Sequence, residues 1–165
     1  MKILATDIPP LWKKFLSGGT QPYDKLAAEF QNTQPDLWNQ LKQIDADWFS
    51  AKTDHVVAYG VFIWSAISSA YGPPAPVPKS LIEQLQQQEE KFLASIEDES
   101  DYAIKNALAE RRRNFPEPAL ASHIEREFEE GSARAKELNP TNNRIALNAL
   151  LITIHALVRT AGSIR

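Results

Sequence analysis

The longest uncharged stretch of the chain is HVVAYGVFIWSAISSAYGPPAPVP, which runs from His55 to Pro78 and holds 24 residues if the histidine is neutral. A membrane-spanning helix needs about 20 consecutive apolar residues. The last seven residues of this stretch include four prolines and a glycine, and they cannot continue a helix. The remaining helical part, about 54–71, contains three serines and Tyr59. We therefore expect a helix that is buried in the middle of a domain rather than a membrane span.

A second uncharged stretch, Ile145–Val158, has 14 residues, which is a typical length for a buried helix in a soluble protein. It lies within a longer helical pattern over 140–161, for which Asn139 is the expected N-cap. The two stretches together predict a pair of central helices that the other helices surround.

Breaks rich in glycine, proline and asparagine separate the rest of the chain into segments with helical apolar spacing. The expected outer helices cover 8–17, 23–31, 35–50, 80–97, 100–113 and 118–137. Ser80 and Glu83 match a capping box at the start of one of them. No segment shows the sustained alternation of a strand. The sequence predicts an all-α, single-domain bundle over 1–165, with about six to eight helices around central helices at about 54–71 and 140–161.

Charge and composition restrict the function classes. The chain has 165 residues, no cysteine and a net charge of −3, which excludes disulfides and thiolate metal sites. Residues 79–138 carry 9 Lys and Arg against 14 Asp and Glu. An acidic chain binds phosphate backbones poorly, so we expect no nucleic-acid partner. The N-terminal segment lacks the apolar region of a secretory signal, and we expect a cytoplasmic protein with no membrane role.

Catalytic and metal-binding patterns are incomplete. His123 and Glu127 share a helix face at i and i+4, but a metal site needs at least one further ligand, so we expect a surface pair. The phosphate-binding loop, zinc-protease and nucleophile-elbow motifs do not occur in the chain. The triplet Arg111-Arg112-Arg113 ends an expected helix, where cations favour the helix dipole. We expect no metal, no cofactor and, on balance, no enzymatic activity.

Three hypotheses for function remain. The first is a protein-interaction or regulatory domain, of the adaptor or immunity type, which binds a partner protein through an acidic surface that includes Glu125, Glu127, Glu129 and Glu130. The second is an enzyme or small-ligand-binding protein with a pocket between the central helices, where the polar contacts would be His155, Asn148, Tyr59 and Thr153. The third is self-association through the apolar C-terminal helix.

Overall fold

The computed structural model describes residues 3–49, 54–134 and 139–161, and within these ranges the chain forms eight helices and no strand. The helices are α1 (Ile8–Ser17), α2 (Thr20–Thr33), α3 (Pro35–Trp48), α4 (His55–Tyr71), α5 (Lys79–Ile96), α6 (Asp101–Arg113), α7 (Pro118–Arg134) and α8 (Pro140–Ala161). The all-α prediction is confirmed. The expected helix ends at 50 and 137 lie outside the described residues.

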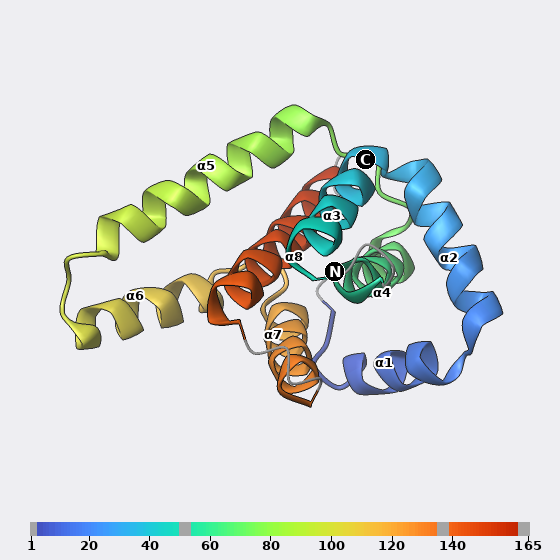
Figure 1. The fold of residues 1–165 in the computed structure, drawn as a ribbon, viewed down its shortest axis with the longest axis horizontal. Coiled ribbons are helices and arrows are strands. Elements are labelled where there is room, and N and C mark those ends of the chain that lie inside the picture. Colours follow the sequence, from blue (N-terminus) through green and yellow to red (C-terminus); the bar gives the residue numbers. More distant parts are fainter. Residues whose placement is uncertain (1–2, 50–53, 135–138, 162–165) are drawn as a thin grey trace.

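Helices α4 and α8 form the centre of the bundle, as predicted, and make the most extensive contact between any two helices (Figure 1). Their facing side chains are excluded from water. The fully buried residues of these two helices include Ile63, Ile67, Leu150, Ile154 and Leu157. A helix that is apolar on most of its circumference is stable only where neighbours cover it on several sides, and α3, α5 and α7 also pack against α8.

A glycine lets α3 approach α4 closely. A Cβ atom at Gly60 would lie 2.3 Å from Cδ1 of the fully buried Leu41, a distance that real side chains do not tolerate. The missing side chain therefore fixes the separation of the two helices.

Helix α1 packs against α4 through aromatic rings. The Trp12 ring of α1 stacks on Tyr59 at a centroid distance of 5.4 Å and meets Phe62 edge-on at 4.8 Å. Offset and edge-on pairs of this kind are favoured by the charge distribution of aromatic rings.

The largest differences from the sequence prediction lie at two helix starts. Helix α2 begins at Thr20 rather than at 23. Helix α5 begins at Lys79 with Pro78 as N-cap, and no side chain caps it, so the capping box of Ser80 and Glu83 is wrong. The N-cap is Pro78, whose backbone is extended, and the helix begins at Lys79. The carboxylate of Glu83 lies 3.9 Å from the ammonium of Lys79 instead. The cap at Asn139 is confirmed, because its Oδ1 accepts hydrogen bonds from the backbone N–H groups of Thr141 and Asn142.

Within the described part of the chain, one helical segment, Thr141–Ala161 in α8, is long and apolar enough to cross a membrane. Half of its most apolar window is buried inside the bundle. Buried core helices pass the same test of length and composition, and α8 packs against α4 in the centre of the bundle.

The eight helices do not form one even shell. Helices α5 and α6 form a hairpin that projects to one side of the central pair, and α1 and α2 lie on the opposite side (Figure 1). This asymmetry positions the site described next.

Candidate functional site

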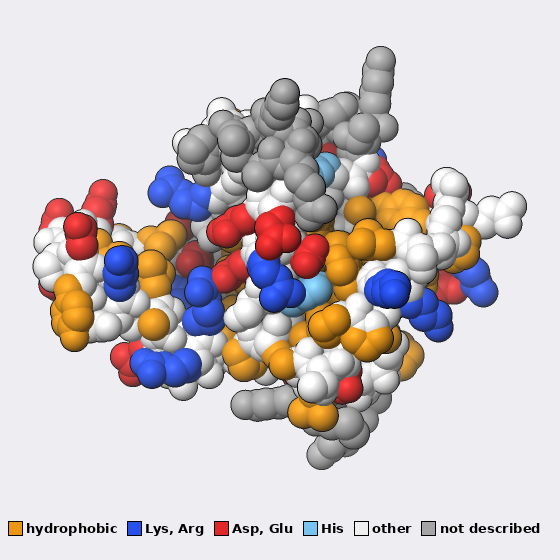
Figure 2. Space-filling view, turned by 90° about the horizontal axis from the view of Figure 1, so that it is seen from below, with side chains coloured by type: hydrophobic (Ala, Val, Ile, Leu, Met, Phe, Trp, Pro, Cys, Tyr) orange, Lys and Arg blue, Asp and Glu red, His pale blue; other side chains and the backbone are white. Residues whose placement is uncertain are grey.

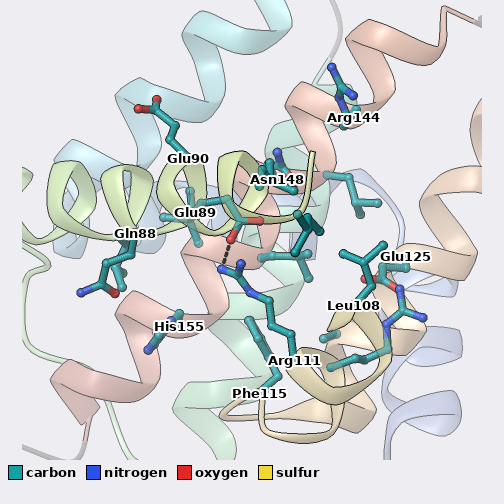
Figure 3. Close-up of a pocket in the computed structure, with 18 of the residues that line it drawn as sticks. Gln88, Glu89, Glu90, Leu108, Arg111, Phe115, Glu125, Arg144, Asn148 and His155 are labelled. Atoms are coloured by element: carbon teal, nitrogen blue, oxygen red, sulfur yellow. Dashed lines mark hydrogen bonds and ion pairs between the residues drawn. The ribbon is translucent and has the colours of Figure 1, made fainter. Parts of the chain in front are cut away.

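A cleft of about 900 Å³ lies between the α5–α6 hairpin and α8 (Figure 3). Its walls also include Phe115 after α6 and two residues of α7, Ala121 and Glu125. Most of the wall is apolar. The apolar side chains are Leu85, Leu93, Ala94, Ile96, Ile104, Leu108, Phe115, Ala121, Ile145, Leu147, Leu151 and Ile152. The space is therefore a partly open cleft with an apolar floor and charged groups around it.

The cleft exists because the hairpin packs only at its base. Helix α5 buries Ile82 and Leu85 near its start, and α6 buries no residue completely. Further along the hairpin, Leu93 and Leu108 face the cleft with 36% and 41% of their surface exposed. Exposed leucines on the inner side of a hairpin form an apolar surface that nothing in the described chain covers.

Gln34, a fully buried side chain of the segment between α2 and α3, holds the first connection of the hairpin. Its Nε2 donates hydrogen bonds to the carbonyl oxygens of Pro74 (3.2 Å) and Ala75 (3.0 Å). Its Oε1 accepts a 2.8 Å hydrogen bond from the backbone N–H of Val77. A single amide thus satisfies three backbone groups of the proline-rich connector, which leads directly into α5.

Glu117, which is also fully buried, holds the second connection. One carboxylate oxygen accepts a hydrogen bond from the backbone N–H of Ile3 (2.9 Å), and the other accepts from the Tyr71 hydroxyl at the end of α4. The hairpin is therefore anchored firmly at both of its connections while its far end makes few buried contacts.

Two ion pairs cross the cleft region. Arg111 of α6 pairs with Glu89 of α5, and this pair joins the two helices of the hairpin (Figure 3). Arg112 pairs with Glu125 of α7 at 2.6 Å and joins the hairpin to the body of the protein. Burial raises the pKa of both carboxyl groups, and the neighbouring arginine opposes that rise in each case.

The structure brings His155 and Asn148 into this cleft, on the wall that α8 provides (Figure 3). The His155 ring meets Phe115 edge-on at a centroid distance of 5.9 Å. Burial lowers the pKa of His155, and the positive charges of Arg159 and Arg111 lower it further. The imidazole therefore favours its neutral form, which can both donate and accept a hydrogen bond.

The other two residues of the predicted pocket lie elsewhere. Tyr59 packs between Trp12 and Phe128, and its hydroxyl donates a hydrogen bond to the carbonyl oxygen of Glu127. Thr153 is fully buried, and its hydroxyl donates to the carbonyl oxygen of Ala149 one turn earlier. The pocket at His155 thus opens toward α5 and α6 rather than between α4 and α8.

The predicted acidic surface divides into two parts. Glu125 lines the cleft and pairs with Arg112. Glu127 is partly buried, and its carboxylate lies 3.8 Å from the guanidinium of Arg126. Glu129 and Glu130 are exposed. On the face shown in Figure 2, acidic side chains gather near the middle of the view with Lys and Arg side chains among them. This is a mixed surface, and one of its acids belongs to the cleft.

His123 is not the surface residue that the sequence predicts. It is only 5% exposed, because the rings of Trp12 and Phe62 cover it. Arg126 donates a hydrogen bond to its Nδ1 (3.2 Å), and burial lowers its pKa. Within the described ranges no three histidine, aspartate or glutamate side chains come together as a possible metal site.

Sequence reasoning did not predict the pair of Glu89 and Arg111, although each residue stands within an apolar stripe. Glu89 lies between Leu85 and Leu93 at i+4 spacing, and Arg111 lies between Leu108 and Phe115 at spacings of three and four. A charge on the apolar face of a helix indicates a partner across the contact. The spacing gives no indication that the two charges pair with each other.

Comparisons with protein-family models, with curated proteins and with solved structures found no match for this chain.

Proposed function

We propose that this protein is a non-enzymatic interaction domain that docks a helical segment of a partner protein in the cleft between the α5–α6 hairpin and α8. The observation that carries the proposal is the cleft itself: about 900 Å³ of space with a mainly apolar wall and two accessible leucines, Leu93 and Leu108. An accessible apolar surface of this kind is unfavourable in water and becomes favourable when a partner covers it.

The secondary structure of the walls supports a helix as the docked element. The cleft is formed mainly by side chains of helices, and the described residues include no strand whose free edge could pair with an extended peptide. An apolar groove between helices instead receives the apolar stripe of an amphipathic helix. The cleft also unites two features that the sequence suggests separately, because Glu125 of the acidic surface and His155 of the expected pocket both line it.

The charged groups of the cleft support a binding role rather than catalysis. Glu89 and Glu125 are each engaged by an arginine, and such pairs position helices more readily than they exchange protons with a substrate. We place this activity in the cytoplasm, as an inference that accompanies the proposal.

A photo-crosslinking experiment in the native cells tests the proposal. Benzoylphenylalanine replaces Leu108 in the cleft or, as a matched control, Leu16, an exposed leucine of α1 on the other side of the molecule. We expect a discrete protein adduct from position 108 and none of the same mass from position 16. Identical adducts from both positions, or none from position 108, would contradict the proposal.

A second candidate is a small-ligand-binding protein. The specific observation in its favour is that a cleft of about 900 Å³ with a few polar groups, here His155 and Asn148, is within the usual size range of small-molecule sites. Native mass spectrometry of the protein purified from its own cells distinguishes the two. A bound small molecule at one equivalent, together with no adduct at position 108, would favour this candidate.

A further inference from the structure

We propose, on the basis of the docking function above, that the partner segment is a basic amphipathic helix. Its apolar stripe would lie on the floor of the cleft, and its Lys and Arg side chains would face the acidic turn at the far end of the hairpin. We define the acidic turn as Glu97, Asp98, Glu99 and Asp101.

The dimensions of the cleft fit one face of a helix. The residues of α5 that line it run from Leu85 to Ile96, which is about 17 Å along a helix axis at 1.5 Å per residue. Spreading about 900 Å³ over that length gives a cross-section of about 50 Å², or a disc about 8 Å wide. A helix with its side chains is about 10–12 Å wide. The cleft therefore covers one side of about three helical turns and leaves the other side in water.

The accessible apolar residues are placed for such a stripe. Leu93 of α5, Leu108 of α6 and Leu151 of α8 all line the cleft, so each of its three helix walls contributes a leucine. An incoming helix with leucines at i, i+3 and i+7 presents one apolar row to walls of this kind.

The charges around the cleft favour a basic segment. Inside it, Arg111 and Arg112 are already engaged by Glu89 and Glu125, so these four charges largely cancel. The other charged lining residues are Glu90, Glu97 and Arg144.

At the far end of the hairpin, the acidic turn is exposed. The segment from Phe92 to Ile104 has no Lys or Arg, and Lys91 and Lys105 flank it, so two cations stand against the four acids. The outer end of the cleft thus carries excess negative charge beside an apolar floor, which complements a helix with an apolar face and a basic flank.

Two synthetic peptides test the proposal against the full-length protein. One is a fluorescein-labelled Leu/Lys amphipathic helix of about four turns, and the other has the same leucine positions with Glu in place of Lys. We expect the Leu/Lys peptide to bind at least about 10-fold more tightly at low salt, and we expect this preference to shrink as salt screens exposed charges.

Matched pairs of variants locate the effect. Glu97→Gln with Asp98→Asn should weaken Leu/Lys binding about 2- to 10-fold, since each exposed charge contributes modestly. Asp24→Asn with Glu29→Gln removes the same two charge types from exposed sites on α2, on the opposite side of the molecule, and should leave the affinity within about 1.5-fold. Equal losses from both pairs, or equal binding of the two peptides, would overturn the basic-helix proposal.

A second matched set of double variants separates this inference from the docking function. Leu93→Gln with Leu108→Gln removes apolar surface from the cleft, and Leu11→Gln with Leu16→Gln removes it from α1. If both peptides bind equally and only the cleft pair abolishes binding, the docking function stands and the charge inference fails. If the cleft pair has no effect on either peptide, the docking function fails as well. A dimer that excludes both peptides and dissociates in the cleft variant would identify a second copy as the occupant and also overturn the inference.

Discussion

The guanidinium of Arg111 on α6 lies over the ring of Phe92 on α5, 4.0 Å from the ring centroid. The same guanidinium pairs with Glu89, which precedes Phe92 by about one turn of α5. One side chain of α6 thus makes a cation–π contact and an ion pair with α5 at once. Arg111 and Glu89 both line the cleft, so the geometry of the hairpin and the geometry of the site depend on the same residue.

The pair of Arg111 and Glu89 should stabilise the hairpin measurably. Both side chains are largely covered, with exposed fractions of 31% and 22%, so solvent screens the pair less than an open surface pair. We expect Arg111→Met and Glu89→Gln to lower the free energy of unfolding by about 1–2 kcal/mol each. A double-mutant cycle in urea should give a coupling of about 1 kcal/mol. A coupling near zero would show that the two charges act independently.

The Gln34 side chain should be one of the most sensitive polar positions in the protein. Gln34→Leu removes three hydrogen bonds and leaves the N–H of Val77 and the carbonyl groups of Pro74 and Ala75 without that partner. We expect a loss of about 2–4 kcal/mol in the free energy of unfolding. Gln31→Leu, at an exposed position near the end of the adjacent helix α2, should change it by less than about 0.5 kcal/mol. Comparable losses from the two variants would refute the anchoring role of Gln34.

Gly60 should not tolerate even a methyl group. Its added Cβ would meet Leu41 at 2.3 Å, so we expect Gly60→Ala to cost about 1–3 kcal/mol through overpacking. Gly18→Ala is the control, because its backbone is helical and its nearest neighbour to a new Cβ is at 3.4 Å. Thermal unfolding of both variants gives the comparison. A Gly60→Ala protein as stable as the parent would mean that α3 and α4 can separate without cost.

Acidification should weaken the fold through His123 and His155. Burial lowers the pKa of both in the folded state, so the unfolded chain binds their protons more tightly. Their contribution to stability is therefore complete above the unfolded pKa of about 6.5 and is lost as the pH falls below it. Urea unfolding between about pH 7 and pH 5 should show this decline.

Substitution of each histidine tests whether it causes this dependence of stability on pH. His123 faces Trp12, Phe62, Arg126 and Glu127, and the Glu127 charge opposes the lowering of its pKa. We expect His123→Gln and His155→Gln each to flatten the dependence of stability on pH. A slope unchanged in both variants would contradict the assignment. The buried carboxyl groups with raised pKa act in the opposite sense, since the folded state binds their protons more tightly, and the comparison of variants removes their effect.

Apolar periodicity was sufficient to identify the helices and the central pair. The 3.6-residue period of Leu, Ile and Phe reports which face of a helix is buried, and a stretch without charge reports burial on all sides. The group that caps the start of α4 could not be predicted from the sequence. The carboxylate of Asp45 on α3 accepts hydrogen bonds from the N–H groups of Val56 and Val57, and no local pattern predicts a cap that comes from another helix.

The sequence by itself determined the helix positions, the choice of α4 and α8 as the core, and the presence of His155 and Asn148 on a helix that other helices cover, because these properties depend on local spacing and on burial. Only the tertiary structure decided that the far end of the α5–α6 hairpin leaves a cleft beside α8, that Arg111 meets Glu89, and that Glu125 and His155 share this cleft. Such contacts join residues far apart in the chain, and their geometry depends on helix packing angles and on anchors such as Gln34.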